Sequence, residues 1–376
     1  LFNLKNALGT SGYDATSGEF FCGASYAARI KGCTPFFITG GPTVGLGANL
    51  QDNGVGGGVI GDPTRAYTAE DVAQSLNYVG YTLNQSQGNS ANIFSGNISG
   101  DLFELPAGMW SFALGFDMRE LDGFISPDSL VAEGGSSTNF QLPTSGEQSI
   151  DEYYVELNMP LLKDIFLVQE LELTYAFRQS YYNSAGIADV DPTDASPLTG
   201  YVVLPEISTG NSFVGAKLKP IDSLLVRYTW GESFRAPTIS DLFGGTGEGF
   251  PQAADPCVGT AYGNLTALGQ ATCDAQTGLT GATTQPFAQI RGLFGSSVAL
   301  QPETGKNETI GLVWSPGFLE GFEMSVDYWK IELDNAISSY SVGFVMNQCY
   351  GNGTAQDISF CPFITRNPAD PVDPGL

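Results

Sequence analysis

The 376-residue sequence contains no histidine and only 15 basic residues against 40 acidic ones. Without histidine, the chain cannot build a Ser-His-Asp triad, a histidine-based zinc site or a histidine ligand to haem. The net charge of -25 repels nucleic acid phosphates, which argues against a DNA or RNA partner. The acidity fits either a solvated soluble surface or acidic loops that face a cation-rich exterior. We therefore expect no enzyme active site, no cofactor, no metal centre and no nucleic acid partner.

Long apolar runs are also missing from the sequence. No stretch approaches the roughly 18 consecutive apolar residues of a transmembrane helix, which excludes that element without excluding a membrane. The chain begins with LFNLKNALG, and we expect that any export signal lies outside this sequence. Short apolar runs alternate instead with clusters rich in Gly, Pro, Asn, Asp and Ser, and glycine reaches 48 residues. This pattern predicts a mostly β structure.

Six cysteines occur, none of them in a C-x-x-C arrangement, which disfavours metal ligation. They form three close pairs in loop-like segments: Cys22 and Cys33, Cys257 and Cys273, and Cys349 and Cys361. Local disulfides in an oxidising compartment explain this spacing better than free thiols do. The pairing of neighbours is inferred from their placement in loops.

Alternation of apolar and polar residues marks the strands. In MWSFALGFDMREL (109–121), every second residue from Trp110 to Met118 is apolar, whereas the residues that alternate with them, from Ser111 to Arg119, are small or polar. The same period of two places Leu171 and Val226 on apolar rows of their own segments, which is the signature of a strand with two different faces. Eight strands are predicted, at 91–105, 110–122, 150–159, 169–182, 211–219, 223–235, 306–316 and 321–334.

The connections between these strands alternate between short and long. The short ones lie at 106–109, 160–169, 219–222 and 316–321, and the long ones at 123–149, 183–210, 236–303 and from 335 onward. If neighbouring strands are antiparallel, all short turns lie at one end and all long loops at the other, as in an outer-membrane β-barrel. A soluble β-sandwich also alternates, but it gives no reason for this segregation.

Residues 1–90 show no clear strand pattern. We expect a loop-rich extracellular segment of the barrel there, with one short helix in TAEDVAQSLNYV (68–79). The predicted organisation is thus a loop-rich segment over 1–90, followed by antiparallel strands with long loops over 91–376.

Three motifs then occur in a fixed order: ESFRAPTISDLFGG (232–245), LQPETGKNETIGLVWSP (300–316) and MSVDYWKIELDNAI (324–337). In this order they resemble the barrel of TonB-dependent outer-membrane receptors. In that family a strand ends in an F-R-A-P segment at the extracellular rim, and a later strand opens with a P-E-T segment. The resemblance extends from about residue 91 to the end of the sequence, and residues 32–42 resemble the family more weakly.

The resemblance implies an all-β fold: an antiparallel transmembrane β-barrel that has 22 strands in the family, of which about eight are readable here. We expect an internal barrel fragment, with the plug domain, the TonB-contacting part and the closing strand outside this sequence. It also implies a receptor in the outer membrane of a Gram-negative bacterium, surrounded by lipid, that captures a scarce bulky nutrient and imports it with energy from the TonB complex. Siderophores, vitamins such as cobalamin, oligosaccharides and peptides remain open as ligands. The alternative is a secreted β-sandwich adhesin or carbohydrate-binding module; a surface hydrolase is disfavoured by the missing catalytic groups.

The rim motif is the main candidate site: Ser233, Phe234, Arg235, Ala236 and Pro237. Arg235 shares its parity with Arg227 and Ser233, so its guanidinium can point into the polar interior and pair with a carboxylate there. Pro237 cannot donate to the strand ladder and ends the strand. Trp230 and Phe234 are expected in an aromatic girdle at the rim. We interpret the motif as structural, with ligand contact as the alternative.

Two acidic features suggest other chemistry. Two pairs of carboxylates on strands could act as the acid and base of a glycosidase: Glu152 with Glu156, and Glu170 with Glu172. Polar residues that face the interior of a barrel would show the same pattern. The segment DVDPTD (189–194) could hold calcium through Asp189, Asp191 and Asp194, although a solvated acidic loop is the simpler interpretation.

Overall fold

The computed structural model describes residues 2–9, 11–14, 16–35, 59–60, 69–190, 198–277, 285 and 288–366. The chain forms two compact units, Leu1–Gln85 with Pro127–Phe140, and Ser86–Ser126 with Gln141–Leu376. The first division falls near the predicted boundary at residue 90, but the segment between the second and third long strands groups with the N-terminal unit. Among the described residues, no helix is both long and apolar enough to cross a membrane.

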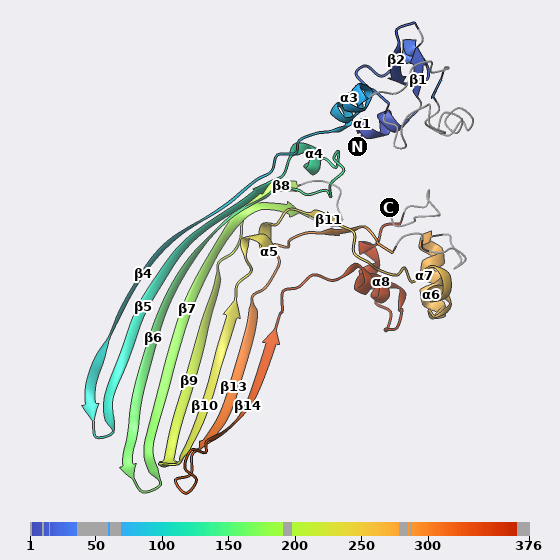
Figure 1. Ribbon diagram of the computed structural model, residues 1–376. Helices are drawn as coiled ribbons and strands as arrows, with labels where there is room; N and C mark the ends of the chain where they lie inside the picture. Colours follow the sequence, from blue (N-terminus) through green and yellow to red (C-terminus); the bar gives the residue numbers. More distant parts are fainter. Residues whose placement is uncertain are drawn as a thin grey trace. The chain divides into compact units, whose positions relative to one another are not determined.

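The second unit is built on one antiparallel sheet of nine strands (Figure 1). Its strands are β4 (Ser86–Leu105), β5 (Gly108–Ser126), β6 (Thr144–Ile165), β7 (Val168–Val190), β8 (Leu198–Val203), β9 (Ile207–Ile221), β10 (Leu224–Arg235), β13 (Glu303–Trp314) and β14 (Met324–Asp334). The order across the sheet is β14-β13-β10-β9-β7-β6-β5-β4, and β8 pairs with the upper part of β7. Figure 1 shows the turns of the four hairpins β4–β5, β6–β7, β9–β10 and β13–β14 at one end of the sheet, as the connection lengths predicted.

All eight predicted strands are confirmed, and most are longer than predicted. The predicted connection over 160–169 is wrong: β6 and β7 continue through most of it, so that only Phe166 and Leu167 form the turn. A β-bulge between Pro160 and Leu162 accommodates the proline, which cannot donate to the ladder. The sequence also missed β8, which occupies part of the long connection predicted over 183–210.

Strand register assigns each residue to a face. Residues directly opposite each other in an antiparallel pair lie on the same face. Leu114, Val155 and Phe177 form one such row on the apolar face. The neighbouring row, Gly115, Tyr154, Arg178 and Asn211, lies on the polar face. The alternation predicted from sequence therefore separates the same residues in the sheet.

Charges on the polar face pair across strands. Lys217 Nζ lies 2.9 Å from Glu172 Oε1, and Arg227 donates to both oxygens of Asp327, at 2.7 and 2.8 Å. The second pair spans β13 directly over Gly311, where a Cβ atom would collide with both side chains. A residue larger than glycine would thus separate this ion pair.

The two outermost strands, β4 and β14, each pair on one side only within the described part of the chain. The total of 22 strands for the complete barrel stays a prediction.

The loops after β10 and β14 contain the remaining helices and short strands of this unit, and part of these loops forms a small hydrophobic core. The elements of the loops are α5 (Ile239–Phe243), β11 (Gly247–Gly249), α6 (Gly259–Gly263), α7 (Ala267–Thr277), β12 (Gly292–Phe294), α8 (Val342–Tyr350) and the 3-10 helix η3 (Ile358–Phe363). Cys257, Leu265, Cys273, Met346, Cys349 and Tyr350 are buried together, and we name this cluster the loop core. The disulfides Cys257–Cys273 and Cys349–Cys361 close one loop each. The loop core therefore joins two loops that are distant in sequence.

A buried ion pair completes the loop core. Arg366 donates to both oxygens of Asp255, at 2.5 and 2.7 Å, and its Nε donates to the Tyr350 hydroxyl at 2.9 Å. The two charged side chains are only 4% and 9% exposed. Burial by itself would lower the pKa of Arg366, but the hydrogen bonds and the charge of Asp255 raise it overall. Arg366 therefore stays charged, and the pair neutralises itself away from water.

The N-terminal unit contains α1 (Phe2–Leu8), β1 (Ser11–Asp14), β2 (Glu19–Cys22), the 3-10 helix η1 (Tyr26–Ala28), β3 (Val59–Ile60), α3 (Ala69–Val79) and α4 (Ser129–Ala132). Its three strands form a small sheet in the order β2-β1-β3, which the sequence did not predict, whereas α3 confirms the predicted helix. The disulfide Cys22–Cys33 lies in a core with Ala7. All three disulfides thus join the neighbouring cysteines expected from sequence. An extracellular location for this unit stays a prediction.

Candidate binding site on the polar face of the sheet

The end of β10 parts from β9, although it stays paired with β13 as far as Arg235. The ladder between β9 and β10 stops at the pair Gly231 and Phe213, although both strands continue further. Beyond that point the Ser212 amide donates to the Glu232 carboxylate at 3.2 Å instead of to a strand carbonyl. The parity of β10 would place Phe234 on the apolar face, yet its ring lies 5.4 Å from that of Tyr182, which is on the polar face. The end of β10 therefore passes over the polar face of its neighbours, and the predicted girdle position of Phe234 is wrong.

Helix α5 continues this inward path. Thr238 and Asp241 form a capping box that starts the helix, and Leu242 and Phe243 are each 1% exposed. The helix packs on β6 and β7 above Gly146 and Gly186, where a Cβ atom on Gly186 would lie 2.6 Å from the Phe243 ring. These glycines leave the space that α5 occupies.

Gly186→Val is expected to displace α5 and to destabilise its packing on the sheet by about 1 to 3 kcal/mol, because the valine side chain would overpack the space between β7 and the Phe243 ring. Native-state hydrogen exchange of the amides of Leu242 and Phe243 measures this cost. Gly200→Val in β8 is the matched control, because nothing lies within 4 Å of its Cβ position. Unchanged protection in Gly186→Val would show that α5 does not rest on this surface.

Arg235 of the rim motif links three elements. Its Nε donates to Glu303 Oε2 at 2.6 Å at the start of β13, and its Nη1 donates to Asp241 Oδ2 at 3.2 Å in α5. Pro237 follows the strand, and its carbonyl accepts from the Gln148 amide of β6 at 3.1 Å. Ser233 lies opposite Gly305, and Ala236 joins the strand to the α5 segment. This geometry supports the structural interpretation of the rim motif, which stays a prediction until Arg235 is substituted.

The buried carboxylate of Glu152 lies in the same region of the polar face as the end of β10. Glu152 is 5% exposed and accepts hydrogen bonds from Arg119, from the Ser180 hydroxyl at 2.8 Å and from the Tyr182 hydroxyl at 3.4 Å. The Arg119 guanidinium also lies 2.7 Å from Asp117. The buried charge of Glu152 is therefore compensated within the wall, as a buried carboxylate requires.

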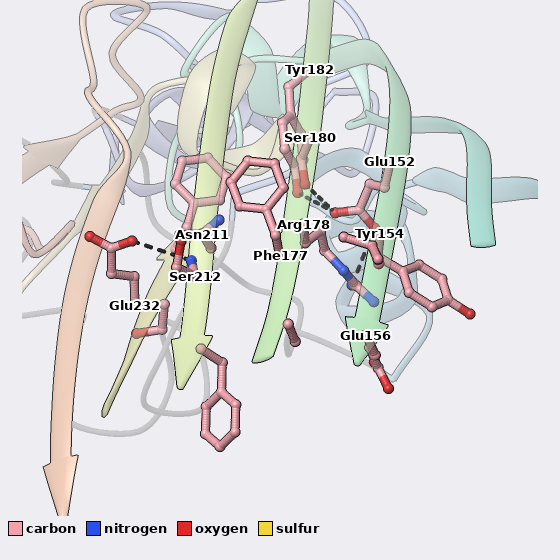
Figure 2. Close-up of a pocket in the computed structure, with 15 residues that line it drawn as sticks. Glu152, Tyr154, Glu156, Phe177, Arg178, Ser180, Tyr182, Asn211, Ser212 and Glu232 are labelled. Carbon is pink, nitrogen blue, oxygen red and sulfur yellow. Dashed lines mark hydrogen bonds and ion pairs between the residues drawn. The ribbon is translucent and has the colours of Figure 1, made fainter. Parts of the chain in front are cut away.

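Arg178 is held more loosely than the other arginines of the sheet. Its Nη1 lies 3.6 Å from Glu152 Oε2, its guanidinium lies 5.4 Å from the centre of the Tyr154 ring, and its side chain is 52% exposed. Figure 2 shows Arg178 beside Tyr154, between Glu152 and Glu156 on one side and Asn211 on the other. The guanidinium thus keeps donors for another group.

Two cavities lie side by side on this face. One of about 350 Å³ is lined by residues of β6, β7, β9 and the inward end of β10, including Phe213, Glu232 and Phe234. The other, of about 450 Å³, is lined by β4, β5, β6 and β7. Glu152, Tyr154 and Arg178 line both of them. We name the first cavity, which contains the end of β10, the β10 cleft.

The remaining sequence candidates are dispersed. Glu172 pairs with Lys217, whereas Glu156 is exposed at the β10 cleft. The proposed calcium segment lies outside the described residues, apart from the backbone of Asp189 and Val190. Among the described residues, no group of three or more Cys, Asp or Glu side chains is arranged so that it could hold a metal ion. Sequence alternation placed Arg178 and Tyr154 on the polar face, but it gave no signal that they meet.

The fold defines a class of protein. A continuous antiparallel sheet with one apolar and one polar face, with its short turns at one end, is the wall of a transmembrane β-barrel. The family model described as "TonB dependent receptor-like, beta-barrel" matches residues 7–370, and the chain belongs to this family. The match also covers most of the first 90 residues, where the sequence motifs were weak. Searches of curated proteins and of solved structures returned no match. The family consists of outer-membrane receptors and transporters of Gram-negative bacteria rather than of enzymes.

Proposed function

We propose that this chain forms the wall and extracellular loops of an outer-membrane receptor that captures a scarce nutrient and imports it with energy supplied through TonB. The observation that carries the proposal is the division of the sheet into an apolar and a polar face. In such a wall every backbone group bonds within the sheet while one face meets lipid and the other meets water. A plug domain and the TonB contact belong to the complete receptor in this proposal.

The apolar face argues against the alternative of a secreted β-sandwich. In a sandwich this face would be covered by a second sheet. Here Phe94, Ile98 and Leu114 on that face are 68%, 63% and 44% exposed. Contact with lipid chains accounts for this exposure.

The β10 cleft supports a binding role for the polar face. It combines aromatic walls with a few polar groups, which is the usual composition of a ligand site. Siderophores, vitamins, oligosaccharides and peptides all remain candidates at the level of the family, since fold does not select among them.

The proposal is tested by measuring, in intact cells, on which side of the outer membrane the turns and the loops lie. Cysteine is introduced at Phe166, which is 91% exposed in the β6–β7 turn, or at Leu268, which is 65% exposed in the loop after β10. The described native cysteines are all in disulfides, so they should not react with a maleimide. A membrane-impermeant maleimide is expected to label Leu268→Cys on intact cells and Phe166→Cys only after the outer membrane is permeabilised. Equal labelling of both variants on intact cells would favour a secreted protein instead.

A further inference from the structure

Arg178 differs from the other arginines of the large sheet in its bonding. Arg119, Arg227 and Arg235 each donate hydrogen bonds to carboxylates. The side chain of Arg178 makes no hydrogen bond to any residue that the structure describes, and its one ion pair has the long separation of 3.6 Å. Its nearest carboxylate, on Glu152, is already occupied by Arg119, Ser180 and Tyr182. The guanidinium of Arg178 is therefore available to a group outside the chain.

The surroundings of Arg178 define the chemistry of such a group. A guanidinium presents a planar set of donors that matches the two oxygens of a carboxylate. The Tyr154 ring lies against the guanidinium, and Phe213 and Phe234 line the same cleft. A cavity of about 350 Å³ falls within the size range of small-molecule sites. The β10 cleft thus offers one anion-binding fork and apolar walls.

Two further carboxylates limit how much negative charge the cleft accepts. Glu156 and Glu232 also line it, and Glu232 is only partly engaged, by the Ser212 amide. A ligand with several carboxylates would be repelled by these two side chains. A ligand with a single carboxylate brings only one negative charge into the cleft and therefore meets less of this repulsion than a polycarboxylate does.

We propose that the β10 cleft binds small monocarboxylates with an aromatic or other apolar ring, with Arg178 holding the carboxylate and the rings of Tyr154 and Phe213 contacting the body. This inference rests on the proposed receptor function, for which it names the ligand class. Arg178 is then a specificity-determining residue of the receptor.

Three probes of similar shape and different charge test this assignment: benzoate, benzamide and benzylamine. The full chain is refolded in detergent with 15N-labelled arginine, and the side-chain Nε signal of Arg178, identified by its loss in Arg178→Gln, is followed in titrations. Benzoate is expected to shift this signal saturably and to bind about tenfold or more tighter than benzamide, because a hydrogen bond to a charged partner is stronger than one to a neutral partner. Benzylamine is expected to bind more weakly still.

Variants separate the role of Arg178 from general charge. Saturation-transfer NMR, which observes the probe, is expected to show loss of benzoate binding in Arg178→Gln and weaker binding in Arg178→Lys, which keeps the charge but loses the fork. Arg227→Gln is the matched control, since Arg227 is on the same face but pairs with Asp327 and lines neither cavity.

Three results would overturn the assignment: no saturable binding of benzoate up to about 50 mM, a concentration that detects even weak affinities; tighter binding of benzylamine than of benzoate; or unchanged benzoate affinity in Arg178→Gln. The cysteine-labelling pattern in cells does not depend on Arg178. Failure of the ligand class is therefore distinguishable from failure of the receptor function.

Discussion

Leu173→Arg is expected to destabilise the membrane-inserted protein by about 2 to 4 kcal/mol if Leu173 lies near the bilayer midplane. Leu173 pairs with Met159 and Ala216 on the apolar face, so the arginine would place a charge among lipid chains. Refolding titrations into lipid vesicles, followed in urea, measure the free energy of unfolding. The effect should decrease for substitutions of apolar-face residues closer to either end of the strand, because the cost of a charge depends on its depth.

Thr174→Arg is the matched control for this prediction. Thr174 is the next residue along β7, faces the polar side and donates to Asn158 at 3.3 Å. Its substitution loses one partly buried hydrogen bond between neutral groups, which is worth about 1 kcal/mol. Equal destabilisation by the two variants would mean that the faces of β7 are assigned wrongly, or that no lipid covers the apolar side.

Arg366→Met is expected to destabilise the loop core by about 3 to 5 kcal/mol, because it leaves the buried Asp255 carboxylate without its partner. Burial raises the pKa of Tyr350, so this neighbour stays neutral and supplies no replacement charge. Hydrogen exchange of the amides in α7 and α8 reports the local stability. Since the pKa of Arg366 is raised, its charge and its contribution persist at every pH below the ordinary range of arginine, and the loss should be similar at neutral and mildly alkaline pH.

The double variant Asp255→Asn with Arg366→Met removes both charges and should recover a large part of the lost protection. A double variant as unstable as Arg366→Met alone would show that packing by the long arginine side chain, rather than the charge on Asp255, accounts for the loss. Both results should be compared with disulfides intact, because the two bridges limit how far the loops can open.

Much of the fold could be predicted from local patterns in the sequence. Period-two alternation located all eight long strands and divided Leu173 from Thr174 correctly, because side chains of a strand alternate between faces whatever the partner. The three disulfides joined sequence neighbours, since short loops bring such cysteines together. The helix at 69–79 was readable from its acidic first turn.

The candidate site could not be read in the same way. Parity continued along β10 places Phe234 on the outside, and only the parting of β10 from β9 brings it to Tyr182. Arg119 and Glu152 are 33 residues apart and meet through the register of β5 with β6, which no local pattern specifies. The availability of Arg178 depends in turn on that meeting, because Arg119 occupies the carboxylate that Arg178 would otherwise share.

The loop core has a consequence for the order in which the protein folds. Asp255 and Arg366 are 111 residues apart, and the hairpin β13–β14 lies between them. Closing so long a loop costs chain entropy that the ion pair alone does not recover, so the hairpin must first bring the two ends near each other. Either disulfide can close early within its own loop, but the joint packing of Cys257 with Cys349 has to wait for the last two strands. We therefore expect the strands to assemble before the loop core packs, and a chain arrested before β14 should expose unburied halves of this core to proteases.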